Sequence, residues 1–201
     1  MNIEERYINN LNDLRNNLSL LSNYSMDSAE NKNRNQINRN RILIALYNDW
    51  KPSDYKIVDY LFNEEKKLRQ SNLETENYEV DVLYLASYIL TKFNKVEDIW
   101  KFIDSKTTDF DSSIGFDSKY LLSFGVERVK KFLKEEENSK SKITDLVNIN
   151  LLEPNYTQED IEDWKIYKHN YFAVFEFPIK DEIDFSFQAK EYKNLEKLLP
   201  K

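Results

Sequence analysis

The apolar residues of this chain recur mainly at spacings of three and four, which is the period of an amphipathic helix. Near the N-terminus the stripe consists of Ile3, Tyr7, Leu11, Leu14, Leu18 and Leu21. By this pattern we expect helices at about 3–23, 30–50, 52–69, 78–93, 96–105, 117–134 and 188–199. The sequence therefore predicts a mainly α fold built from layered helical hairpins.

The stretch EEENSKSK at 135–142 interrupts this pattern. It is charged and contains serine, which is typical of a surface linker. We therefore expect a single helical domain over 1–201, with a linker at 135–142 before a C-terminal subregion, 143–201.

Two further patterns lie in that C-terminal subregion. Thr157 followed by Asp160 resembles a capping signal, and it predicts a helix at about 158–170. The next segment, YFAVFEFPIKDEIDFSF at 171–187, is rich in aromatic and β-branched residues that partly alternate with polar ones. Such a pattern is compatible with a small C-terminal β-hairpin.

Both glycines of the chain, Gly115 and Gly125, lie within the segment Glu97–Leu133. Glycine serves where the backbone needs a positive φ or a close approach that a Cβ atom would block. We expect one special turn here. At Gly125, inside the helical stripe of 117–134, we expect a close helix crossing.

Composition limits the classes of function. The chain has no cysteine, so disulfides and thiolate metal sites are excluded. No apolar run approaches the roughly 20 residues that span a bilayer, and the polar N-terminus lacks a secretion-signal pattern. These features favour a cytoplasmic protein without membrane association. The net charge of −7 disfavours nucleic-acid binding and favours a basic protein partner.

No catalytic, cofactor or metal site is predicted. His169 is the only histidine, and no glycine-flanked serine accompanies it, so a surface role is expected. Asp109, Asp111 and Asp117 fail the calcium-loop pattern, because that loop requires glycine at position 6 and glutamate at position 12. Helix capping and turn hydrogen bonds explain these aspartates better. Two glycines cannot build a phosphate-binding loop.

The stretch NKNRNQINRNR is locally basic through Lys32, Arg34, Arg39 and Arg41. One interpretation is a patch for nucleic acid or an acidic partner. The other is a solvated helix face, which we favour because no stacking aromatic residues are interleaved.

The segment 97–117 combines acids with aromatic residues, as a surface that binds a basic protein would. The other interpretation is that its aromatic residues belong to the core. The candidate partner-binding residues are Glu97, Asp98, Trp100, Asp104, Asp109, Phe110, Asp111, Phe116 and Asp117.

The motifs DIW (Asp98–Trp100), DFD (Asp109–Asp111) and GFD (Gly115–Asp117), and Gly125 before an apolar helix, carry a resemblance. Over residues 97–133 the chain resembles small, acidic, helical immunity proteins of bacterial polymorphic toxin systems. That resemblance implies a non-enzymatic antitoxin that occludes one cognate toxin domain, and it implies no catalytic residue. The alternative hypothesis is a helical adaptor or scaffold subunit of a bacterial assembly. A hydrolase is the weakest hypothesis, because no nucleophile–base pair can be named.

Overall fold

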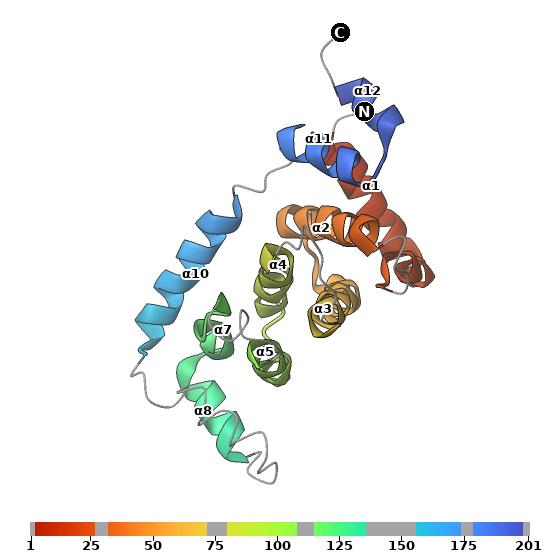
Figure 1. Ribbon diagram of the computed structural model, residues 1–201. Helices are drawn as coiled ribbons and strands as arrows, with labels where there is room; N and C mark the ends of the chain where they lie inside the picture. Colours follow the sequence, from red (N-terminus) through yellow and green to blue (C-terminus); the bar gives the residue numbers. More distant parts are fainter. Residues whose placement is uncertain are drawn as a thin grey trace. The chain divides into compact units, whose positions relative to one another are not determined.

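The computed structural model describes residues 3–26, 32–71, 80–107, 115–135, 156–173 and 179–198. Within these ranges the regular elements are all helices and no strand occurs (Figure 1). None of the described helices is both long and apolar enough to cross a bilayer. The predicted mainly α, layered helical architecture is thus confirmed.

The chain divides into two compact units, which we call unit 1 and unit 2. Unit 1 comprises Met1–Ile89 and Ala173–Lys201, and unit 2 comprises Leu90–Phe172. The single-domain organisation stays a prediction. The proposed linker at 135–142 lies outside the described residues, except for Glu135 at the end of a helix.

Unit 1 is built around one central helix, α2 (Lys32–Asp49), which α1, α3 and α11 all contact. The other elements of the unit are α1 (Ile3–Asn16), η1 (Leu18–Tyr24), η3 (Pro52–Asp54), α3 (Tyr55–Gln70), most of α4 (Val80–Thr91), α11 (Ile179–Gln188) and α12 (Tyr192–Leu198). In Figure 1 the blue pair α11 and α12 lies beside the red α1. Unit 1 therefore joins the two ends of the sequence.

The apolar stripes predicted for unit 1 form its core. Tyr7, Leu11 and Leu14 of α1 are each at most 2% exposed. Six consecutive residues of α2, from Ile42 to Tyr47, are also buried. Such a run buries more than one side of the helix, as expected for a helix with neighbours on several sides.

Unit 2 has an aromatic core around Phe102. Its helical elements are the end of α4, η4 (Val96–Asp98), α5 (Ile99–Lys106), α7 (Lys119–Leu122), α8 (Val126–Glu135) and α10 (Gln158–Ala173, its last residue in unit 1). The Phe102 ring centroid lies 5.8 Å from Tyr120, 5.8 Å from Phe124 and 6.1 Å from Phe116. Aromatic pairs at these separations add to the stabilisation from burial.

The structure divides the single helix predicted for 117–134 at Gly125. Helix α7 ends at Leu122 and α8 begins at Val126, with Gly125 between them at φ +102°. A Cβ atom at Gly125 would meet its nearest neighbours, Arg128 Cβ and Gln158 Oε1, at an ordinary 3.8 Å. The close helix crossing expected at Gly125 is wrong, because this glycine supplies a backbone angle rather than space.

The C-terminal region contains one confirmed prediction and one that fails. Asp160 Oδ2 accepts hydrogen bonds from the Thr157 backbone and hydroxyl, each 2.7 Å, and Thr157 Oγ accepts from the Asp160 N–H. This is the predicted capping box of α10. The β-hairpin proposed for 171–187 is not supported. Residues 171–173 end α10 and 179–187 belong to α11, while 174–178 lie outside the described residues.

The helical conformation of α11 has a physical cause that alternation in the sequence conceals. Glu182 and Ser186, four residues apart, are both buried, and the Ser186 hydroxyl donates to Glu182 Oε1 at 3.1 Å. Both side chains also bind Arg41 of α2. In a helix residues i and i+4 are adjacent, whereas in a strand they lie about 13 Å apart, so this polar contact requires the helical conformation.

Candidate functional site

The acids predicted to bind a partner do not form one exposed surface. Glu97 and Asp104 are exposed, as predicted. Asp98 is 2% exposed, and its Oδ1 accepts a hydrogen bond from Lys101 Nζ at 2.6 Å. Asp109 and Asp111 lie outside the described residues. Of the acids of segment 97–117 that the structure describes, two are therefore exposed, Glu97 and Asp104.

The predicted aromatic anchors of the same segment are largely internal. Phe116 is fully buried beside Phe102, and Trp100 is half-buried with its ring 6.2 Å from Phe132. Phe110 lies outside the described residues. For Phe116, the interpretation as a core residue is the correct one.

Asp117 has a structural role that fits the capping interpretation. Its Oδ1 accepts from the Lys119 N–H at 3.0 Å, at the start of α7. Its Oδ2 accepts from the Trp164 indole Nε1 at 2.7 Å. The Trp164 ring also stands edge-on against Tyr120, with centroids 4.8 Å apart. Asp117 and Tyr120 together fix the inward face of α10.

The opposite, outward face of α10 joins acids to exposed apolar side chains. Its first turns expose Glu159, Asp160, Glu162 and Asp163. The next turns expose three large apolar or aromatic side chains: Ile166 (60%), Tyr167 (58%) and Tyr171 (37%). We call these seven residues the α10 face. Large apolar side chains that cluster at a polar rim are typical of protein-interaction surfaces.

The sequence held a signal for this face. The inward residues Ile161, Trp164 and Phe172 follow the helical period and are buried. Ile166 lies about half a turn from them, where a solvated helix would carry polar residues, and Tyr167 lies beside Trp164 at the edge of the inward stripe yet is exposed. The helix itself was predicted, but these two exposed residues were not recognised as a candidate surface.

Neither interpretation of the basic stretch of α2 is correct for Arg39 and Arg41. Arg34 is exposed, but Arg39 and Arg41 are 0% and 1% exposed. Arg39 Nε donates to the buried carboxylate of Glu65, and its Nη1 donates to the Tyr24 carbonyl at 2.8 Å. Neither arginine is part of a surface patch or of a solvated face, because each pairs with a carboxylate inside unit 1.

The second of these arginines belongs to a charge cluster centred on Glu182. The two carboxylate oxygens of Glu182 accept six hydrogen bonds, which come from Arg6, Tyr7, Arg41, Ser186 and Asn194. Glu191 completes the cluster by accepting from both Arg6 and Arg41. Two arginines therefore balance two glutamates. We call this group, Arg6, Tyr7, Arg41, Glu182, Ser186, Glu191 and Asn194, the Glu182 cluster.

The cluster stabilises the charged forms of Arg41 and Glu191. Burial alone would lower the pKa of Arg41, but hydrogen bonding to Glu191 and the charges of Glu182 and Glu191 outweigh it, so the pKa is raised. Burial, together with the hydrogen bond to Glu182, raises the pKa of Tyr7 above its usual value. Tyr7 is therefore a hydrogen-bond donor and not a base at neutral pH. This arrangement holds α11 and α12 against α1 and α2.

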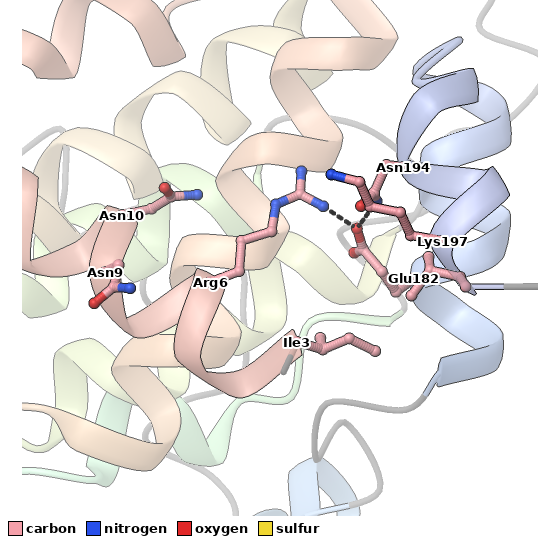
Figure 2. A pocket seen from close by; sticks show the side chains of 8 residues that line it. Ile3, Arg6, Asn9, Asn10, Glu182, Asn194 and Lys197 are labelled. Atoms are coloured by element: carbon pink, nitrogen blue, oxygen red, sulfur yellow. Dashed lines mark hydrogen bonds and ion pairs between the residues drawn. The ribbon is translucent and has the colours of Figure 1, made fainter. Parts of the chain in front are cut away.

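An open pocket lies on the solvent side of the cluster (Figure 2). It has a volume of about 630 Å³ and is lined by Ile3, Arg6, Asn9, Asn10, Glu182, Asn194, Lys197 and Leu198. Two of its charged residues, Arg6 and Glu182, bind each other at 2.6 Å. These two side chains are therefore already engaged within the Glu182 cluster.

Side chains that bind metal ions do not gather in the described part of the chain. No three histidine, aspartate or glutamate side chains come close enough there to hold a metal ion. His169 is exposed on α10, the surface location that was expected.

Comparison of the chain with models of protein families, with curated proteins and with solved structures gives no match. The function is therefore argued from the surfaces and charges of the chain itself.

Proposed function

We propose that this chain is a non-enzymatic protein-binding protein that recognises a basic partner through the α10 face. One observation carries the proposal. Ile166 and Tyr167 are 60% and 58% exposed, directly after the exposed acids of the same helix. Burial of such side chains against a partner supplies binding energy, at about 25 cal/mol per Å² of apolar surface.

The acids of the face select the charge of the partner. Glu159 and Asp163 are both exposed, and four residues apart they lie on one side of α10. A positive surface would be attracted during encounter, and a negative one would be repelled. Glu97 and Asp104, exposed in the same unit, would add to this attraction.

The narrower proposal is an immunity protein that occludes a basic toxin domain. It is supported by the resemblance of residues 97–133 to such proteins and by the net charge of −7. Occlusion requires a stable surface rather than a reactive one, and the inward anchoring of α10 through Trp164 supplies it. The alternative is a helical adaptor, which would use the same face without inhibiting its partner.

Co-expression with candidate basic toxin domains tests the proposal. The wild-type chain should restore growth and bind the purified toxin domain. Tyr167→Ala together with Ile166→Asp should abolish rescue and raise the dissociation rate at least about tenfold, since aromatic anchors dominate interface energies. The charge variant Glu159→Lys/Asp163→Lys should mainly slow association and reduce its salt dependence.

Two matched controls separate this face from other surfaces. Phe187→Ala removes an aromatic side chain that is 67% exposed in unit 1, and it should bind like wild type. Glu97→Lys/Asp104→Lys carries the same charge change as the α10 variant and tests the segment predicted from sequence. Normal rescue and binding by both folded α10 variants would refute the α10 face. Binding without growth rescue by the wild-type chain would favour the adaptor.

A further inference from the structure

A second pocket of unit 1 gathers positive charge in an otherwise acidic chain. It adjoins the pocket in Figure 2, since Asn194 and Lys197 line both. Its volume is about 550 Å³, and its lining includes four exposed cations, Arg34, Lys190, Lys193 and Lys197. We call it the basic pocket.

The charge of this pocket is not neutralised by the described residues. None of the four cations forms an ion pair with a described residue. One acid, Glu191, does line the pocket, but its oxygens accept from Arg6 and Arg41 of the Glu182 cluster. Lys193 and Lys197, four residues apart on α12, repel each other. A bound anion would relieve that repulsion.

The backbone of Lys190 ends α11. Its φ is +57°, in the left-handed region that glycine or asparagine usually occupies at the end of a helix. The Lys190 N–H donates to the Phe187 carbonyl at 3.0 Å, and the Glu191 N–H donates to the Ser186 carbonyl at 2.7 Å, so this residue closes the helix. Lys190 also lines the pocket, and it is therefore a member of the cation group held at a fixed helix end.

The remaining lining residues indicate the shape of the ligand. Tyr192 is 59% exposed and lines the pocket, so it presents an aromatic ring beside the cations. The lining residue Asn194 is held in place because its Nδ2 donates to Glu182 Oε1 at 2.9 Å. A volume of this order accommodates a small organic ligand. Phosphate groups suit lysine and arginine, and a planar base suits an exposed aromatic ring.

We propose that the basic pocket binds a phosphate-bearing small molecule of nucleotide size. The cations hold the phosphates and Tyr192 stacks on the base. Because the chain has two glycines, recognition uses side-chain charge instead of a glycine-rich loop. The net charge of −7 opposes a long nucleic acid, whose binding depends on many phosphate contacts. The site is separate from the α10 face and does not depend on the function proposed for it.

Calorimetric titration of the full chain with ATP, tripolyphosphate and adenosine at low salt tests the site. ATP should bind more tightly than tripolyphosphate, and adenosine alone should bind weakly. Lys193→Glu/Lys197→Glu should weaken ATP binding at least about tenfold. The control Lys130→Glu/Lys131→Glu carries the same charge change on α8 and should leave binding unchanged. Tyr192→Ala should weaken ATP about tenfold and tripolyphosphate little.

Lys190→Gly separates binding from folding. Glycine relieves the strain of a positive φ, so this variant should raise the Tm by about 2 °C or more while it weakens ATP binding. A residue with a purely structural role would not produce opposite changes in stability and affinity.

Three results would overturn the proposal. The first is the absence of binding by both ATP and tripolyphosphate at 1 mM, roughly the weak limit of specific binding. The second is ATP binding that Lys193→Glu/Lys197→Glu does not alter. The third is binding of a short single-stranded oligonucleotide far more tightly than ATP, which would identify a nucleic-acid surface instead.

Discussion

Units 1 and 2 bury different chemistry. At the centre of unit 2 are Phe102, Phe116, Tyr120 and Phe124, stacked or tilted against one another and at most 5% exposed. Unit 1 also buries apolar side chains, but it adds ion pairs at Arg41–Glu182, Arg39–Glu65 and Arg15–Asp54. An aromatic core tolerates imperfect contacts, whereas a buried ion pair depends on every partner being present.

This difference explains how segments that are far apart in the sequence are held together in one unit. The Glu182 cluster links α1 and α2 to α11 and α12, across a separation of 141 residues for Arg41 and Glu182. Apolar surfaces associate without strict geometry, but a bidentate arginine–carboxylate pair accepts one register. We infer that the cluster specifies where the C-terminal helices dock on unit 1.

The largest expected loss of stability comes from Phe102→Ala. This side chain is fully buried beside three aromatic neighbours of unit 2, Phe116, Tyr120 and Phe124. Its removal should lower the free energy of unfolding by about 4 kcal/mol, from lost burial and the cavity left behind. Urea denaturation measures the loss. Hydrogen exchange should show it mainly in unit 2, and equal deprotection of α11 would contradict the comparison.

Glu182→Gln should cost roughly 3 kcal/mol, because it leaves two arginines, Arg6 and Arg41, to share the single carboxylate of Glu191. Hydrogen exchange should increase first in α11 and α12, which the cluster holds. The control Glu127→Gln alters an acid whose side chain is 87% exposed, and it should have no measurable effect.

The double variant Arg41→Met/Glu182→Leu sharpens this result. If the pair mainly specifies register, the double variant should regain much of the stability lost in Glu182→Gln, because no charge remains unpaired. A double variant less stable than Glu182→Gln would mean that the pair itself contributes most of the stabilisation.

The sequence predicted the apolar unit better than the ionic one, for a physical reason. Core residues such as Phe102 and Tyr120 repeat at helical spacing, and that period is visible locally. Arg41 also lies on a buried side of its helix, but a charged residue is ordinarily a sign of solvent. Its burial depends on Glu182, which local periodicity cannot connect to it.

The candidate surfaces show the same limit. The segment 97–117 was chosen for its acids and aromatic residues, yet Asp98 and Phe116 are buried and Asp117 binds Trp164. Composition marks residues that can bind a partner, but packing decides which of them remain exposed. The α10 face could have been recognised from sequence, because Ile166 departs from the inward stripe of its own helix.

Gly125→Ala tests the turn between α7 and α8 in unit 2. At φ +102° an alanine is strained, and stability should fall by about 1 to 2 kcal/mol. The nearest atoms to a Cβ are 3.8 Å away, so Gly125→Leu should lose a similar amount. Thermal melts compare the two variants, and a much lower Tm for leucine would restore the close helix crossing expected from the sequence.

The smallest expected effect is the acid sensitivity contributed by Glu191 of unit 1. Burial would raise the pKa of Glu191, but the hydrogen bonds and charges of Arg41 and Arg6 outweigh it and lower the pKa. A carboxylate with a lowered folded pKa stabilises the fold above its unfolded pKa, and this stabilisation is lost as the pH falls through the folded value. Because Glu191 is only partly buried, solvent screening should limit its contribution to about 1 kcal/mol or less.

Glu191→Gln should therefore be less stable than wild type at pH 7, and urea midpoints should converge when both are measured near pH 3. The exposed variant Glu135→Gln, whose partner Lys131 is also exposed, should follow wild type at both pH values. A difference for Glu191→Gln that persists unchanged at pH 3 would show that the side chain acts through packing, and the ionic description of the Glu182 cluster would then rest on Glu182 alone.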